Sequence, residues 1–150
     1  KIGVGAMKFG DLINNVSKDY VFDLDKFLSF EGKTGPYIQY TVARINSILS
    51  KVEDLNEQIS ITDEEQRNIV RAILKLNSSY EICYRDKSLN ALCLAVYDLA
   101  SAFSTFYNFH NVVGQKDKQV QQSYVSLLKL VKKKIEQALY VLAIEVPEKM

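Results

Sequence analysis

The chain has 150 residues, of which 47% are hydrophobic, so it is long enough for one domain that buries most of its apolar surface. It contains no Trp, only 2 Pro and 6 Gly, and this shortage of turn-forming residues disfavours a many-stranded sandwich and favours long helices. Its formal net charge of +1 is too small for a dedicated double-strand nucleic-acid binder, so any contact with RNA should be local and depend on stacking.

In the first thirty residues, the sequence pattern predicts short secondary-structure elements that must pack against another part of the protein. Residues 2–14 are mainly apolar with interspersed glycines, which suits a short helix packed against another element. Residues 19–23 alternate and are compatible with a short strand, and residues 25–30 predict one or two helical turns. Because the chain begins with Lys1 and not with Met, we expect it to be a piece of a longer protein.

A Gly-rich turn precedes the first long predicted helix, which should run from Pro36 to about Val52 with Thr34 or Gly35 as its cap. At 100° per residue, one apolar stripe predicts its buried face. This stripe consists of Ile38, Val42, Ile45, Leu49 and Val52. A second stripe points away from the core and consists of Tyr37, Tyr40, Arg44, Ser47 and Lys51. Exposed tyrosines beside an arginine are typical of a surface that stacks unpaired bases and holds the phosphates between them.

Three further long helices and one short helix are predicted. Thr62 and Glu65 form a capping box that starts the first, which should stop or bend at residues 77–79 before a shorter helix follows. The second spans residues 88–109, and because it carries four aromatic residues between Phe103 and Phe109, at least one, Tyr107, should lie at its edge. The third spans residues 118–143, and its lysines are more typical of a solvated face than of a phosphate-binding patch.

No catalytic, cofactor or metal motif is complete. A phosphate-binding loop ending at Thr34 would need glycine at the position of Phe27, and no HExxH or GxSxG is present. His110 is the single histidine, so we interpret it as a polar residue at a helix end that lacks partners for zinc or for catalysis. Cys83 and Cys93 match no disulfide or zinc framework and are expected to be reduced core residues in an intracellular protein.

Three stretches in order resemble one family, the arginyl-tRNA synthetases. The first joins GVGAMKFGDL to DYVFDLDKFLSFEGKTGPYIQYTVARINSIL, the second is YDLASAFSTFYNFHNV, and the third is LAIEVPEKM. Over nearly its full length the chain is similar to the C-terminal part of these enzymes. The resemblance implies an all-α helical bundle, a DALR-type anticodon-binding domain, over residues 30–150. Residues 1–29 would then be the end of the catalytic body.

The resemblance also implies a function. Such a domain binds the anticodon loop of arginine tRNA and positions it for ATP-dependent aminoacylation by the N-terminal catalytic domain. The implied tRNA-binding residues are Glu31, Gly32, Lys33, Thr34, Tyr37, Tyr40, Arg44, Tyr107 and Met150. Neither the HIGH-type nor the KMSK-type nucleotide motif is present, so ATP and Mg²⁺ belong to the full-length enzyme and this chain should carry no cofactor and no catalytic site. We expect a cytoplasmic protein with neither a membrane nor DNA as partner.

Some residues depart from the family pattern. Tyr124 stands where the motif carries Arg, and LAI replaces the commoner LGI, and we expect both changes to affect packing. Two alternatives stay open. The first is a related helical domain of another class I synthetase, such as the cysteine enzyme. The second is a protein-protein interaction module, in which the second stripe of the helix over residues 36–52 would dock another protein.

Overall fold

A computed structural model describes residues 1–147, which form six helices and no strand. The helices are α1 (Ile2–Leu12), α2 (Leu24–Leu28), α3 (Gly35–Leu49), α4 (Glu64–Asp86), α5 (Asn90–Phe109) and α6 (Lys118–Val141). The expectation of an all-α bundle is confirmed. The short strand expected over residues 19–23 is wrong, because this segment has no neighbouring strand among the described residues and crosses the surface as an extended loop.

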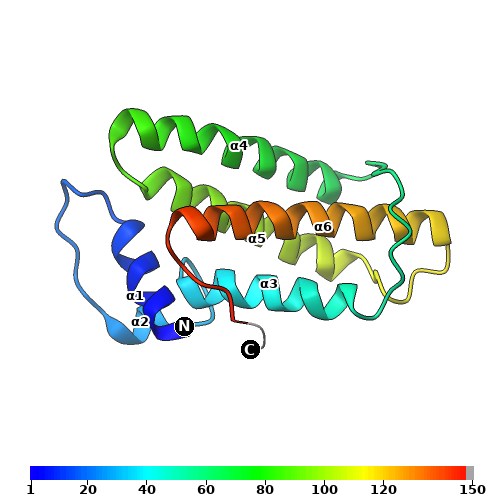
Figure 1. The fold of residues 1–150 in the computed structure, drawn as a ribbon, viewed down its shortest axis with the longest axis horizontal. Helices are drawn as coiled ribbons and strands as arrows, with labels where there is room; N and C mark the ends of the chain where they lie inside the picture. The colour runs from blue at the N-terminus through cyan, green and yellow to red at the C-terminus, as the bar shows by residue number, and fades with distance from the viewer. Residues whose placement is uncertain (148–150) are drawn as a thin grey trace.

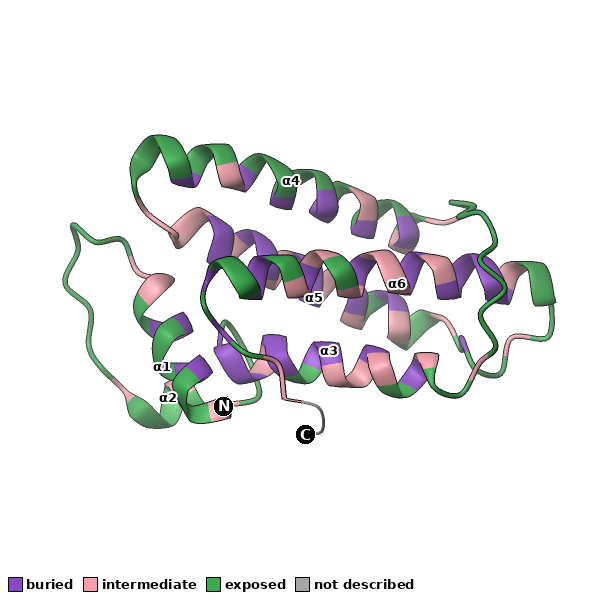
Figure 2. Cartoon of the chain, in the orientation of Figure 1, coloured by how far each residue is buried: buried purple, intermediate pink, exposed green. Residues whose placement is uncertain are grey.

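Helices α3 to α6 form the bundle and run in alternating directions along its long axis (Figure 1). The short helices α1 and α2 lie at one end, against the start of α3. Buried residues face the inside of the bundle on each long helix, whereas the outer faces are exposed (Figure 2). The largest fully buried side chains are Phe9, Ile38, Ile45, Ile69, Leu76, Leu92, Leu99, Phe103, Phe106, Leu127, Leu128 and Ile135.

The caps define where the long helices begin. The Thr34 hydroxyl accepts the Tyr37 amide at 3.2 Å and thereby starts α3, as expected. Helix α4 starts one residue later than expected, because the capping box pairs Asp63 with Gln66 and not Thr62 with Glu65. Helix α3 ends at Leu49, earlier than the predicted end near Val52.

Helix α4 does not stop at residues 77–79 as expected, but continues to Asp86. Leu76, Ser79 and Cys83 are all buried at helical spacing, and the Ser79 hydroxyl donates to the Leu76 carbonyl. A serine usually weakens a helix by offering its backbone a competing partner, but here the burial of its neighbours outweighs that preference. Lys87 follows as the C-cap in a left-handed conformation, with a φ of 53°.

The structure gives partners to two residues whose surroundings were uncertain from the sequence. Tyr124 lies in the core, where its ring packs edge-on against Phe106 at a centroid distance of 5.2 Å. The expectation that His110 lacks partners is wrong, since the carboxylates of Asp63 and Glu65 lie beside its ring. The loop into α4 returns to the end of α5 and brings these residues together.

None of the helices within residues 1–147 is long and apolar enough to cross a membrane.

Candidate nucleic-acid interface

Helix α3 turns Tyr37 and Arg44 towards α5, so this part of the predicted second stripe is a surface shared by two helices. The Tyr37 hydroxyl lies 3.0 Å from the Ser104 hydroxyl, in a hydrogen bond. Its ring packs against Tyr97 with the centroids 5.7 Å apart. Tyr37 is therefore half-buried and held in one orientation by α5.

The structure brings Arg44 and Tyr107 together. The guanidinium carbon of Arg44 lies 4.1 Å from the centroid of the Tyr107 ring, within the range of a cation–π contact. Both residues are half-buried. The ring thus holds the guanidinium in place, and the guanidinium nitrogens are the groups that donate hydrogen bonds to a ligand.

Tyr40 lies on another side of α3 and is the more accessible of its two tyrosines. Its side chain is 43% exposed, and it meets Phe30, which is 51% exposed. The two ring centroids are 6.3 Å apart with an interplanar angle of 84°. An exposed pair of edge-packed rings offers an apolar face on which a base can stack.

The turn before α3 exposes Glu31, Gly32 and Lys33 to solvent. Gly32 has a φ of +79°, a left-handed conformation that glycine adopts without strain. The Lys33 ammonium lies 5.6 Å from the centroid of the Tyr97 ring, so the turn reaches the same part of α5 as Tyr37.

Thr34 differs from its neighbours in the turn because it is buried. Its hydroxyl donates to the Ser29 carbonyl at 2.6 Å and accepts the Tyr37 amide. Both contacts are internal, so this side chain shapes the turn, and the atoms that the turn offers to a ligand belong to the exposed residues before it.

The C-terminal segment runs beside α3. The buried Gln39 amide donates to the Glu145 carbonyl at 2.7 Å, and the Lys8 ammonium donates to the Ala143 carbonyl at 2.6 Å. These bonds hold the segment against α1 and α3 (Figure 1). Met150, the last predicted site residue, lies outside the described residues.

Sequence reasoning missed Tyr97, Ser104 and Phe30, although a signal for the first two was present. Tyr97, Ser104 and Tyr107 share one side of α5 at helical spacing, and a polar or aromatic stripe of this kind indicates a second exposed face. These residues of α5 and the predicted site residues near them form one surface, which we call the α3–α5 face. It consists of Glu31, Gly32, Lys33, Tyr37, Arg44, Tyr97, Ser104 and Tyr107, and we include with it the pair of Tyr40 and Phe30 on the other side of α3.

Comparison with known proteins identifies the family. Residues 38–150 match the family model described as the DALR anticodon binding domain. The chain is 38% identical over 157 residues to the arginine–tRNA ligase of Agathobacter rectalis and 37% identical over 155 residues to that of Alkaliphilus oremlandii. These matches cover 99% and 100% of the chain, which spans 26% of the length of either relative.

A solved structure shows the same arrangement of helices. The arginyl-tRNA synthetase of Thermus thermophilus superposes with a TM-score of 0.91 at 25% identity, over 99% of this chain and 26% of that one. The family model covers most of the chain, including α4, α5 and α6 in full and nearly all of α3. The chain therefore belongs to the DALR anticodon binding domain family.

Proposed function

We propose that the α3–α5 face binds the anticodon loop of arginine tRNA, together with Thr34 in the turn and Met150 at the C-terminus. The observation that carries this proposal is the stacking of Arg44 on Tyr107, which joins a cation and an aromatic ring from two helices at one surface. Membership of an anticodon binding domain family, and relatives that are arginine–tRNA ligases, support RNA as the ligand.

The geometry suits unpaired bases. A splayed base stacks on the exposed Tyr40 and Phe30 rings, and such stacking is worth about 1–3 kcal/mol per base. Arg44, fixed against Tyr107, donates to a base edge or to a phosphate, and Lys33 neutralises a phosphate at the turn. Every arginine anticodon has a central cytosine, whose O2 and N3 accept hydrogen bonds from a guanidinium. This scheme needs no strongly basic surface, which agrees with the net charge of +1.

The full-length protein is, on this proposal, an arginine–tRNA ligase. Its remaining part binds ATP with Mg²⁺ and esterifies the tRNA, while the chain described here selects and orients the tRNA. We place this activity in the cytoplasm, where tRNA is charged.

The N-terminal segment supports a division into residues 1–29 and 30–150. Large apolar side chains are exposed there, and several are half or more exposed. The exposed apolar residues include Met7, Leu24 and Leu28, and those more than half exposed are Val4, Val16, Val21 and Phe22. Because exposed apolar side chains concentrated in one segment indicate a contact surface, we propose that this segment packs against the catalytic body of the same protein. The family model begins only at residue 38, after this segment.

Binding of a fluorescent anticodon stem-loop of arginine tRNA tests the proposal. Arg44→Ala should weaken binding by at least about tenfold, the loss expected for a charge-assisted hydrogen bond. Tyr40→Ala should weaken it by at least about fivefold, in line with one lost stacking contact. Arg85→Ala on α4 and Tyr140→Ala on α6 are matched controls, because both side chains are exposed and neither belongs to the α3–α5 face.

Unchanged binding by both α3 variants would place the RNA surface elsewhere. Binding of a cysteine tRNA stem-loop tests the alternative that the chain is a domain of another synthetase. Equal affinity for the arginine and cysteine stem-loops would contradict arginine specificity. Gel filtration tests the alternative that the chain is a protein-interaction module. Self-association of the chain, with no change of its elution volume when the stem-loop is added, would contradict RNA recognition.

A further inference from the structure

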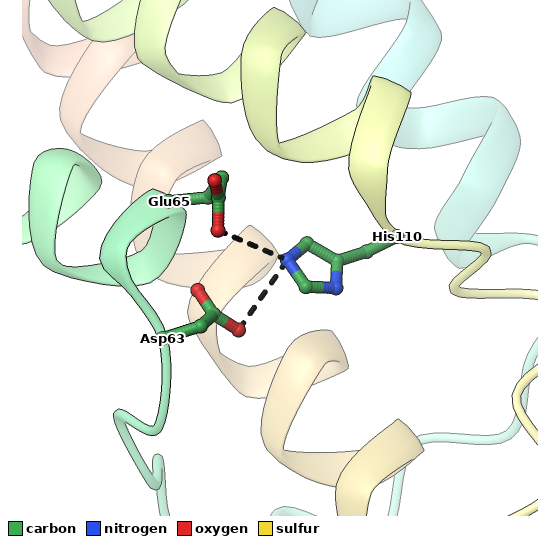
Figure 3. Close-up of side chains that lie close together, drawn as sticks. All are labelled: Asp63, Glu65 and His110. Carbon is green, nitrogen blue, oxygen red and sulfur yellow. Dashed lines mark ion pairs between the residues drawn. The ribbon is translucent and has the colours of Figure 1, made fainter.

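Three titratable side chains converge where the loop before α4 meets the end of α5, outside the α3–α5 face (Figure 3). Asp63 caps α4, Glu65 lies in its first turn, and His110 follows the last residue of α5. The His110 Nε2 atom lies 3.3 Å from Asp63 Oδ2 and 3.9 Å from Glu65 Oε2. One ligand atom from each residue lies within 4.8 Å of the other two.

The imidazole is fixed by its surroundings. The Tyr124 hydroxyl lies 3.2 Å from His110 Nδ1, in a hydrogen bond. The Phe106 and Tyr124 rings pack against the imidazole at centroid distances of 4.5 Å and 5.2 Å. Because the ring contacts two aromatic rings that also pack on each other, and is held at one nitrogen, the direction of the other nitrogen is determined as well.

That other nitrogen, Nε2, is shielded from solvent and makes no hydrogen bond within residues 1–147. A buried polar atom without a hydrogen bond costs about 1–3 kcal/mol. The atom points between the two carboxylates (Figure 3), yet its alignment satisfies neither as a hydrogen-bond acceptor. A cation held by all three groups would satisfy it.

We propose that Asp63, Glu65 and His110 bind a divalent transition-metal ion, with Zn²⁺ as the ion that fits best. An imidazole nitrogen with carboxylate oxygens suits Zn²⁺ and its neighbours in the first transition row, whereas Mg²⁺ and Ca²⁺ prefer oxygen alone. Tetrahedral Zn²⁺ with bonds near 2.1 Å places its ligand atoms about 3.4 Å apart. The separation from Asp63 already matches, and that from Glu65 needs a shift of about 0.5 Å.

The groups around the site support metal binding. If Nδ1–H donates to the Tyr124 hydroxyl, Nε2 presents its lone pair to the ion, and a hydrogen bond of this kind is usual for metal-binding histidines. Asp63 uses different oxygens for its two roles, since Oδ1 accepts the Gln66 amide at 2.8 Å while Oδ2 faces His110. The two carboxylates also offset the positive end of the α4 dipole, which alone would repel a cation.

Although Nε2 itself is shielded, the three side chains are partly exposed, at 17% for His110, 26% for Asp63 and 27% for Glu65. A cavity of about 510 Å³ lies beside the site, between the segment over residues 57–62 and α6. Thr62, Gln66 and Tyr124 line this cavity, and they flank Asp63 and His110. A water molecule from the cavity can serve as the fourth ligand, as in open zinc sites. A bound ion would join the start of α4 to the end of α5.

Zn²⁺ titration of the EDTA-treated, desalted chain tests the proposal by calorimetry, with the Tm followed by circular dichroism. Wild-type protein should bind one Zn²⁺ per chain and gain thermal stability. Glu65→Gln and His110→Gln should each lower the affinity by at least about tenfold, and Asp63→Asn should do so while keeping a cap oxygen. Tyr124→Phe keeps the ring packing but should lower the affinity by roughly tenfold through the lost orienting contact.

Glu64→Gln is the matched control, because Glu64 neighbours the site but pairs with Arg67 and Arg71 on the outer face of α4. It should bind Zn²⁺ as the wild type does. The proposal is overturned if Zn²⁺ leaves the Tm of the wild type unchanged, or if Glu65→Gln and His110→Gln gain as much stability from Zn²⁺ as the wild type. Since each variant is compared with its own metal-free form, a change in its basal stability does not affect the conclusion.

Discussion

The guanidinium of Arg44 lies over the ring of Tyr107, with 4.1 Å between the guanidinium carbon and the ring centroid. The two residues are 63 positions apart in the chain, so only the packing of α3 on α5 creates this contact. Its consequence is orientation, because a long flexible cation is held against a ring before any ligand arrives. A ligand that binds such a pre-oriented group loses less conformational freedom.

Replacing Tyr107 by Leu should weaken binding of the arginine anticodon stem-loop by roughly two- to fivefold, the equivalent of a cation–π contact of about 0.5–1 kcal/mol. Tyr107→Phe keeps the ring below Arg44 and should bind more tightly than Tyr107→Leu. Fluorescence anisotropy with the labelled stem-loop measures both. Equal affinities for wild type and Tyr107→Leu would show that the stacked arrangement does not contribute to recognition.

Thr34→Ala should destabilise the chain by about 1 kcal/mol, because it removes the oxygen that caps α3. Thr34→Ser keeps that oxygen and should retain most of the stability. Urea denaturation followed by circular dichroism compares the two variants with the wild type. A loss of stability that is equal for serine and alanine would assign the effect to the threonine methyl group and not to the cap.

Gly35→Ala should destabilise the chain by about 1–3 kcal/mol, the usual cost of overpacking. A Cβ at this position would lie 2.4 Å from the Gly5 carbonyl oxygen, so α1 and the start of α3 would have to separate. Gly3→Ala is the matched control, since a Cβ there meets no atom within 4 Å among the described residues. Thermal denaturation distinguishes them, and equal Tm values for the two variants would contradict the close packing of α1 on α3.

Alkaline pH should destabilise the chain through Cys93. Burial, with a smaller contribution from Cys83, raises the pKa of the Cys93 thiol from 9.0 to about 12. Above pH 9 the unfolded chain releases this proton while the folded chain keeps it, so stability falls as the pH rises towards 12. The loss from this one group is about 1.4 kcal/mol per pH unit.

Cys93→Ala lacks the titrating thiol and should therefore lose less stability between pH 9 and pH 11 than the wild type does. Urea midpoints at the two pH values measure the difference within each protein, so the cavity left by the substitution cancels. Tyr80, whose pKa burial also raises, contributes to the loss in both proteins. The same decline in wild type and variant would mean that Cys93 does not titrate as described.

Local patterns in the sequence were enough to predict α3 and its cap. Ile38, Val42 and Ile45 of the predicted apolar stripe are fully buried, whereas Leu49 and Val52 at its end are half-buried, and Thr34 caps the helix. Helical periodicity and capping depend on residues a few positions apart, so the sequence shows them directly. The same reasoning missed the cap of α4 by one residue, because Thr62 and Asp63 are both good capping residues and only the backbone distinguishes them.

By itself, the sequence determined the helical class, the order of the long helices and which stripe of α3 faces the core, because these follow from short-range periodicity. Only the tertiary structure decided which residues meet across helices. It set Tyr37 against Tyr97, Arg44 over Tyr107 and His110 beside Asp63, pairs separated by 47 residues or more. Such contacts depend on how whole helices pack, and no local pattern encodes the distance between two residues on different helices.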